Sequence, residues 1–180
     1  MAKPRIGVVS PTEVAFPTVR AAFEELWPEA EPVCVLDQSL YADFINDDMT
    51  VPDVMPEECY DRIARLLRYS QNTGADAVIF CGSVFGRLVE AGREGMDIPV
   101  LTSYEAMIEP GIGQGNRLGI LATTPGTIKC LTDDIVSYAA AHNLTYDLIS
   151  DVADGAFEIL LEGDRPAHDD LVVASAAAMT

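Results

Sequence analysis

"ADAVIFCG" (residues 75–82) is the stretch of sequence that decides the fold. Its apolar residues follow one another without alternation, and a run of this length is typical of a strand that is buried on both faces. The apolar spacing then changes to that of an amphipathic helix, at Val84, Phe85, Leu88 and Val89. A buried strand that leads directly into such a helix is the repeating step of a parallel α/β sheet.

The same alternation of strand and helix continues along the rest of the chain. Buried strands are expected at residues 5–10, 32–37, 75–82 and 98–103, and then at 117–124 and 145–150. Helices are expected over 18–27, from 57 onward, and over 84–89, 125–143, 154–163 and 168–180. The acidic stretch 38–55, which contains Pro52, is expected to be a loop. The sequence therefore predicts the α/β class, with helices on both faces of parallel sheets.

These two series predict two α/β halves, residues 1–112 and 113–180. The second series has two strands and ends on a helix, so we expect a further strand and helix beyond Thr180. The segment "GIGQGNRLG" (111–119) has glycines like those of a dinucleotide-binding loop. It precedes a strand, whereas a dinucleotide-binding loop follows one, so a plain connecting turn is expected here.

The composition excludes several kinds of partner. The 180 residues carry 29 acidic and 11 basic side chains, and the net charge of −18 repels the phosphate backbone of nucleic acids. The apolar runs are too short to span a membrane, and no secretory signal peptide precedes the first strand. The four cysteines lie far apart with no CxxC pair, which predicts reduced thiols in the cytoplasm and no metal site.

Hydroxyl and thiol side chains follow several of the expected strands, at Ser10, Cys81, Ser83, Thr123 and Thr124. Ligands of parallel α/β sheets bind beyond the carboxyl ends of the strands, where backbone N–H groups and the helix dipole favour an anion. Ser83 and Thr124 are each expected to cap the helix that follows, and a cap alone is the commoner role of such residues. Several caps at one sheet edge would form a cradle for a carboxylate.

Cys81 has two interpretations that the residues alone leave evenly balanced. At a helix N-terminus the pKa of a thiol falls from ~8.5 toward neutrality, which makes the thiolate available as a base or nucleophile. Cysteine is also a small apolar side chain that fills the end of a buried strand. Gly82 modestly favours the reactive thiol, because a glycine lets a ligand approach the backbone closely.

Four segments, taken in order, are similar to segments of a known family. They are "RIGVVSPT" (5–12), "AVIFCGS" (77–83), "PVLTSYEAMIEPGI" (99–112) and "RLGILATTPGTIKC" (117–130). Together they resemble the aspartate/glutamate racemase superfamily, and most closely its hydantoin racemase and arylmalonate decarboxylase side. The resemblance covers residues 5 to about 130, and it is weaker beyond.

The resemblance implies two flavodoxin-like halves that face a cleft, with no cofactor. Racemases of this superfamily hold a substrate carboxylate with backbone amides and hydroxyls, and they use two cysteines on opposite faces of Cα. By this resemblance Cys81 is the acid/base of the first half, the substrate is a small carboxylate, and a homodimer is possible. The residues that the resemblance assigns to substrate binding are Ser10, Gly82, Ser83, Thr123, Thr124 and Thr127.

The chain departs from the family pattern at three points. Gly82 stands where the family usually has Asn, and the turn "ATTPGT" (122–127) is one residue longer than the common form. The second cysteine of the family normally follows a strand later than any in this chain. Cys130 is no substitute for it, because it lies on an expected helix.

Three hypotheses follow from these observations. The first is a racemase that acts on a small carboxylate such as an amino acid or a hydantoin. The second is a one-cysteine relative that decarboxylates or isomerises a malonate- or maleate-like diacid, which needs only one proton donor. The third is a non-catalytic module that binds a small molecule, in which Cys81 contributes only packing.

Overall fold

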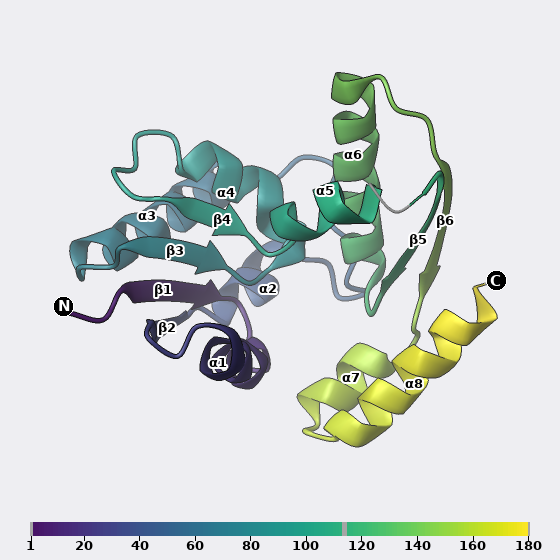
Figure 1. Ribbon diagram of the computed structural model, residues 1–180, viewed down its shortest axis with the longest axis horizontal. Helices are drawn as coiled ribbons and strands as arrows, with labels where there is room; N and C mark the ends of the chain where they lie inside the picture. Colours follow the sequence, from purple (N-terminus) through teal and green to yellow (C-terminus); the bar gives the residue numbers. More distant parts are fainter. Residues whose placement is uncertain (1, 113–114, 180) are drawn as a thin grey trace. The chain divides into compact units, whose positions relative to one another are not determined.

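The computed structural model describes residues 2–112 and 115–179. It contains two parallel sheets, one with the strand order β2-β1-β3-β4 and one that pairs β5 with β6 (Figure 1). Helices alternate with these strands along the chain, so the predicted α/β class with parallel sheets is confirmed. Residues 113–114, which belong to the expected connecting turn, lie outside the described residues.

The chain forms two compact units, each with its own sheet. The first unit is Met1–Asn46 with Pro52–Ser103, and the second is Asp47–Val51 with Tyr104–Thr180. Helix α5 (Glu105–Ile112) is therefore part of the second unit, whereas the division expected from the sequence follows residue 112.

The strands of the first unit end together at one edge. They are β1 (Arg5–Ser10), β2 (Glu31–Leu36), β3 (Ala77–Phe80) and β4 (Val100–Thr102). The helices of this unit are α1 (Ala15–Leu26), α2 (Ser39–Phe44), α3 (Glu57–Asn72) and α4 (Gly86–Gly92), with a 3-10 turn η1 (Ser83–Phe85) before α4. Val8 lies opposite both Cys34 and Ile79 in the parallel register. The residues that follow β1 and β3 consequently meet at the carboxyl edge.

Helices cover both faces of the first sheet. Gly7 faces α3, because a Cβ at this glycine would lie 3.1 Å from the Cβ of Ser70. Side chains alternate along a strand, so Val8 and its register partner Cys34 point to the opposite face. Arg20 of α1 identifies the helix on that face, with its Nη2 3.6 Å from the Cys34 Sγ.

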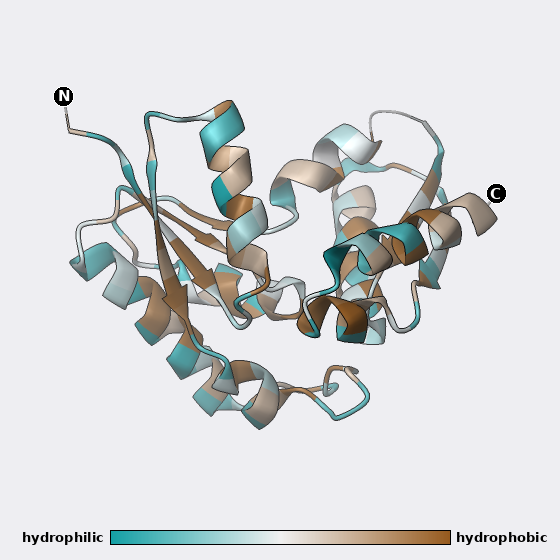
Figure 2. Cartoon of the chain, turned by 90° about the horizontal axis from the view of Figure 1, so that it is seen from below, coloured by the Kyte–Doolittle hydropathy of each residue, from teal (hydrophilic) through white to brown (hydrophobic). Residues whose placement is uncertain are grey.

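The core of the first unit surrounds β1 and β3. Fully buried side chains are contributed by Val8, Val9, Leu40, Ile63, Leu67, Val78, Phe80, Phe85 and Val89. Figure 2 shows the strands of this sheet as predominantly hydrophobic. Helix α1 is less well buried: Leu26 is 79% exposed and Trp27 44% exposed, at the end of the apolar stripe that predicted this helix.

The stretch 38–55 contains a helix that the sequence did not predict. Helix α2 buries Leu40 and Phe44, which lie four residues apart on one of its faces. Arg62 of α3 donates hydrogen bonds to Asp37, just before this helix, and to Asp43 within it. The expectation of a continuous loop is therefore wrong for residues 39–44, because tertiary contacts stabilise a helix that is too short to be stable alone.

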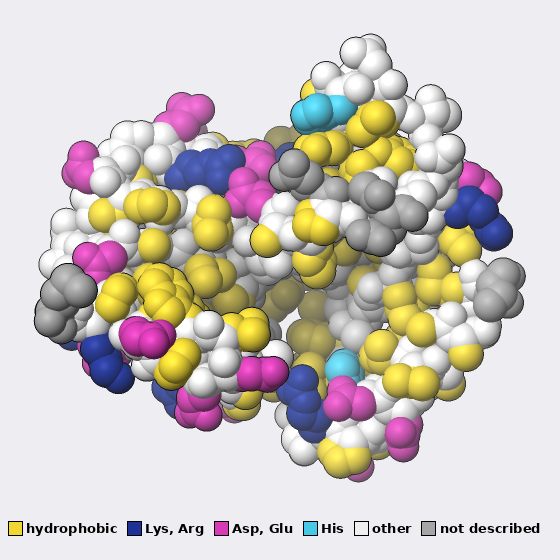
Figure 3. Space-filling model, in the orientation of Figure 1, with side chains coloured by type: hydrophobic (Ala, Val, Ile, Leu, Met, Phe, Trp, Pro, Cys, Tyr) yellow, Lys and Arg dark blue, Asp and Glu magenta, His cyan; other side chains and the backbone are white. Residues whose placement is uncertain are grey.

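The helices and strands of the second unit bury their hydrophobic side chains less completely than those of the first. It contains β5 (Arg117–Ala122), β6 (Asp147–Val152), α6 (Pro125–His142), α7 (Ala156–Leu161) and α8 (Arg165–Ala178), in addition to α5. Helix α6 packs on both strands, while α7 and α8 pack on each other and α8 also contacts β5. Hydrophobic side chains of α8 remain at the surface, among them Val173 (Figure 3). An apolar pocket of about 240 Å³ lies between α5, β5 and α6.

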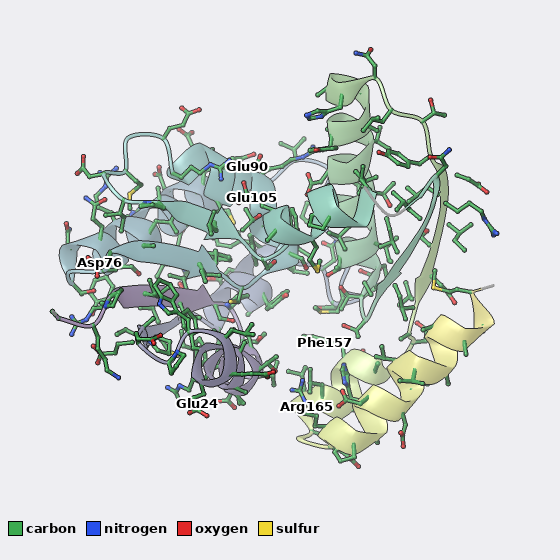
Figure 4. All side chains as sticks on the ribbon, in the orientation of Figure 1. Glu24, Asp76, Glu90, Glu105, Phe157 and Arg165 are labelled. Atoms are coloured by element: carbon green, nitrogen blue, oxygen red, sulfur yellow. The ribbon has the colours of Figure 1, made fainter. Side chains whose placement is uncertain are left out.

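The amino edge of the first sheet is closed by polar contacts. Asp76, labelled in Figure 4, accepts a hydrogen bond from the backbone N–H of Arg5 over 2.7 Å. The Arg5 guanidinium donates to the carbonyl oxygen of Thr73 over 2.8 Å. Ser10, Cys81 and Ser83, which the sequence analysis selected, lie at the other edge. Within the described ranges, no helix has the length and apolar character needed to cross a membrane.

Candidate active site

The turns that follow β1 and β3 meet at the carboxyl edge of the first sheet. The backbone N–H of Cys81 donates to the carbonyl oxygen of Val9 over 2.7 Å, which continues the pairing of these strands beyond Phe80. The Oγ of Ser10 lies 2.7 Å from the Thr12 carbonyl oxygen and 3.2 Å from that of Cys81. These contacts place the Cys81 backbone firmly at the end of β3.

The packing around Gly82 leaves little room for a side chain at this edge. A Cβ at this position would lie 2.9 Å from Cε1 of Phe80 and 3.1 Å from the ring of Pro11. The φ angle of Gly82 is −161°, which is extended backbone that any residue adopts, so packing and not conformation excludes a side chain. The Asn that the family usually has at this position would require Phe80 or Pro11 to move.

Ser83 does not cap the following helix, and this expectation is wrong. The cap position of the 3-10 turn is Gly82, and no side chain caps that turn or α4. The chain makes a turn of only three residues here, closed by a hydrogen bond from the Phe85 N–H to the Gly82 carbonyl oxygen over 3.1 Å. Ser83 therefore lies within the turn next to Cys81.

Cys81 has a raised pKa, which differs from the lowered pKa in one of the two interpretations that the sequence left open. Burial raises the pKa of this thiol to about 11, and the neighbouring Cys34 adds to the effect. The predicted decrease needs the N-terminus of an α-helix, but a short 3-10 turn follows Cys81 in its place. The thiol is consequently protonated at neutral pH, so in its resting state it is a proton donor.

Arg62 and Asp37 form an ion-pair network at the end of β2. The guanidinium donates to Asp37 from Nε over 2.8 Å and from Nη2 over 2.9 Å, to Asp43 from Nη1 over 2.6 Å, and to Ser39. It also lies over the ring of Phe44, 5.9 Å from the centroid. All three guanidinium nitrogens are thus engaged, and the network fixes α2 against α3.

The same network controls the ionisation of Asp37. Burial on its own would raise the pKa of this carboxyl. Hydrogen bonds from Ser39 and Arg62, together with the Arg62 charge, outweigh burial and hold the pKa below its usual value. The sequence analysis did not select Arg62, because an arginine in a later helix gives no local signal of its partner.

The second unit carries the threonines that the sequence analysis selected. Thr124 caps α6, as expected, with its Oγ1 accepting a hydrogen bond from the Thr127 N–H over 3.3 Å. The hydroxyl groups of these two residues are 3.0 Å apart. Thr124 is buried, while Thr123 and Thr127 are half-buried. Thr123, Thr124 and Thr127 therefore form one cluster at the start of α6.

A segment from the first part of the chain contributes to the same helix end. The N–H of Gly126 donates to the carbonyl oxygen of Met49 over 3.1 Å. Met49 has a φ of 59°, a left-handed conformation that is rare for residues other than glycine, and Asp48 holds the adjoining turn by accepting from Thr50. A carboxylate that bound at this helix end would compete with Met49 for the Gly126 N–H.

The expected site residues thus lie in two clusters, one in each unit. Ser10, Cys81, Gly82 and Ser83 adjoin one another in the first unit, and Thr123, Thr124 and Thr127 do so in the second. The part of the chain that the structure describes shows no group of His, Cys, Asp or Glu side chains suited to a metal ion. His168 lies outside both clusters, where its Nδ1 is 2.7 Å from Oδ1 of Asp169 and its side chain is 14% exposed.

A family model described as Asp/Glu/Hydantoin racemase matches residues 6–180. This match includes both clusters and nearly the whole of both compact units. A comparison with curated proteins gives no match.

Solved structures with a similar fold include racemases and a decarboxylase. An allantoin racemase from Klebsiella pneumoniae is 17% identical with a TM-score of 0.67, over 97% of this chain and 68% of the racemase. A glutamate racemase from Francisella tularensis is 16% identical with a TM-score of 0.62, over 91% of this chain and 58% of the racemase. A mutant of arylmalonate decarboxylase is 19% identical with a TM-score of 0.60, over 98% of this chain and 74% of the decarboxylase. The likeness shows the fold, and the chain spans between 58% and 74% of the length of these proteins.

Proposed function

The chain belongs to the Asp/Glu/Hydantoin racemase family, and we propose that it is a cofactor-independent racemase in which Cys81 is the acid/base. The observation that carries this proposal is the placement of Cys81 at the carboxyl edge of the first sheet, with its N–H bonded to Val9. Catalytic groups in parallel α/β folds lie at this edge, beyond the ends of the strands. The proposed substrate is a small carboxylate or a cyclic amide with an acidic Cα–H.

Racemisation requires Cys81 first to lose its thiol proton to solvent, since the raised pKa makes the thiolate the minor form at neutral pH. The thiolate then removes the Cα proton. The electron pair of the broken C–H bond moves into the neighbouring carboxyl or carbonyl group, which becomes an enolate. Hydrogen-bond donors aimed at this oxygen stabilise the new charge. We assign this role to the Gly82 N–H and Ser83, which adjoin Cys81 in the first unit. Thr123, Thr124 and Thr127 of the second unit are proposed as carboxylate-binding groups from the family resemblance alone. By the same resemblance a second thiol gives its proton to the opposite face of the carbon, which completes the inversion.

The raised pKa of Cys81 favours a second candidate function, the decarboxylation of a malonate-like diacid. In that reaction the C–C bond to one carboxylate breaks, CO₂ leaves, and its electron pair forms an enediolate on the remaining carboxyl group. The Cys81 S–H then gives its proton to the carbon, and solvent returns a proton to sulfur. This route uses one thiol in its protonated form, which is the form that burial of Cys81 favours.

Proton transfer in D₂O tests both candidates. The protein is incubated with both enantiomers of allantoin and glutamate and with an arylmalonate, the compounds that the names of the similar structures suggest. A racemase exchanges the Cα–H of either enantiomer for deuterium, which NMR detects as loss of the proton signal. A decarboxylase releases CO₂ and forms a singly deuterated acid. If none of these compounds reacts but one of them raises the melting temperature of the protein, the chain is a non-catalytic module that binds a small molecule.

The free thiols and the net charge of the protein support proposals about its cellular compartment and its partners. We propose that the protein works in the reducing cytoplasm, since its cysteines are free thiols in the structure. Its net charge of −18 argues against nucleic acid as a partner. A homodimer is proposed from the family resemblance alone, and the molar mass in solution, measured by light scattering, tests it.

A further inference from the structure

We propose that Ser10 is a positioning residue for Cys81 and Gly82, in place of the substrate-binding role that the resemblance suggested. The inference rests on the proposed function for its catalytic meaning, but its geometry belongs to the first unit alone. Ser10 has no exposed surface, and its hydroxyl lies among the backbone groups of the two turns that follow β1 and β3.

Ser10 joins the carboxyl ends of three strands. Its carbonyl oxygen accepts a hydrogen bond from the Asp37 N–H over 3.0 Å, which holds the end of β2. Its hydroxyl accepts from the Thr12 N–H over 3.2 Å and lies within donating distance of the Cys81 carbonyl, at the end of β3. Ser10 reaches both neighbouring strand ends because β1 lies between β2 and β3 in the sheet.

The hydroxyl of Ser10 is committed to this edge. A hydroxyl has one proton to donate, and its two nearest acceptors are the carbonyl oxygens of Thr12 and Cys81. Pro11 packs against this edge from the next position, since its ring would lie 3.1 Å from a Cβ at Gly82. Direct contact between Ser10 and a ligand would require both turns to open.

The planarity of the peptide group extends the effect of Ser10 to Gly82. The carbonyl of Cys81 and the N–H of Gly82 belong to one trans peptide unit and point in opposite directions. Because the Ser10 hydroxyl lies 3.2 Å from that carbonyl, within donating distance, it also restricts the direction of the Gly82 N–H, the donor assigned above to the developing negative charge. The Cys81 N–H is held by Val9 on the other side of the residue. The backbone that carries the thiol is therefore held on both sides.

Ser10→Ala and Ser70→Ala form a matched pair for the test. Ser70 is the other fully buried serine of the first unit, its Oγ donates to the Leu66 carbonyl oxygen over 3.1 Å, and it lies on α3. Peptide-resolved mass spectrometry measures the alkylation rate of Cys81 by iodoacetamide at a fixed pH. We expect Ser10→Ala to raise this rate about fivefold, because the released turn exposes the thiol. Ser70→Ala is expected to leave it unchanged, and Ser10→Thr, which keeps the hydroxyl, to restore the wild-type rate.

Steady-state kinetics supply a second readout. Ser10→Ala is expected to lower kcat about tenfold with little change in KM. The reason is that the Gly82 N–H would no longer point at the negative charge that develops in the transition state. A rise in KM with kcat unchanged would mean that Ser10 binds substrate, and equal alkylation rates in all four proteins would mean that it positions nothing. Either result overturns the proposal. If the wild type has no activity, the proposed function fails while the alkylation series still decides the role of Ser10. Should Ser10→Ala not fold, Ser10→Cys replaces it as the variant with a weakened donor.

Discussion

The backbone N–H of Cys81 lies 2.7 Å from the carbonyl oxygen of Val9, so the pairing of β1 with β3 continues into the residue that carries the thiol. The side chain is consequently held at the sheet edge by the backbone pairing of these two strands. It is also half-buried there, next to the face that α1 covers. This placement gives the thiol its raised pKa, and several measurable properties depend on it.

The alkylation rate of Cys81 is expected to increase with pH up to about pH 11. Only the thiolate reacts with iodoacetamide, and burial raises the pKa of this thiol to about 11. Mass spectrometry of the Cys81 peptide after short exposures gives the rate at each pH. A rate that levels off near neutral pH would show instead that the thiolate is stabilised, as the sequence alone suggested.

The free energy of unfolding is expected to fall from about pH 9 to about pH 11. Burial raises the pKa of both Cys59 and Cys81 to about 11 in the folded protein, from an ordinary value of 9.0. In this interval the unfolded chain loses these protons while the folded protein keeps them, so a higher pH favours unfolding. Urea unfolding at a series of pH values measures the effect. The fall should be smaller in Cys81→Ala, and an equally steep fall in that variant would assign it to other groups.

Arg62→Met is expected to destabilise the protein by about 2–3 kcal/mol, because it leaves Asp37 largely buried without its charged partner. Arg65→Met is the matched control on the same helix. Arg65 pairs with Asp61 over 3.7 Å, but both side chains are largely exposed, so its loss should cost less than about 0.5 kcal/mol. Urea unfolding measures the free energy of unfolding of both variants. Equal values would contradict a structural role for the Arg62 network.

Met49→Gly is expected to stabilise the protein by roughly 0.5–1 kcal/mol, because glycine adopts a φ of 59° without steric cost. Asn143→Gly relieves the same kind of backbone strain at the end of α6, where φ is 54°. Asparagine tolerates this conformation better than methionine does, so a smaller gain is expected there. Thermal unfolding compares the two. A lower melting temperature for Met49→Gly would show that the methionine side chain contributes more than its backbone strain costs.

The sequence predicted the features that depend on nearby residues. The strands β1 and β3 follow from short apolar runs, and the Thr124 cap of α6 follows from a residue three positions away. Helix α2 was missed because it depends on Arg62, which is far away in the sequence. Hydrophobic patterns along a sequence do not reveal ion pairs between residues that are far apart in it.

The chemistry of the candidate site was predicted only in part. The position of Cys81 at a strand end follows from the apolar run before it, but its pKa depends on burial by segments that are distant in sequence. The same limitation applies to Ser10: the strand-end position was clear, while its hydrogen bonds run to Thr12 and Cys81, two different turns. Contacts between separate strand ends decide which residue meets a ligand and which one holds the backbone.

The D₂O reaction of Cys81→Ala, on a substrate that the wild type turns over, decides whether Cys81 transfers the proton. We expect a loss of about a thousandfold or more in the rate of deuterium incorporation, the scale of a missing general acid or base. Cys130→Ala, a half-buried thiol on α6, should keep the wild-type rate. A Cys81→Ala protein that is folded and incorporates deuterium as fast as the wild type would contradict the account.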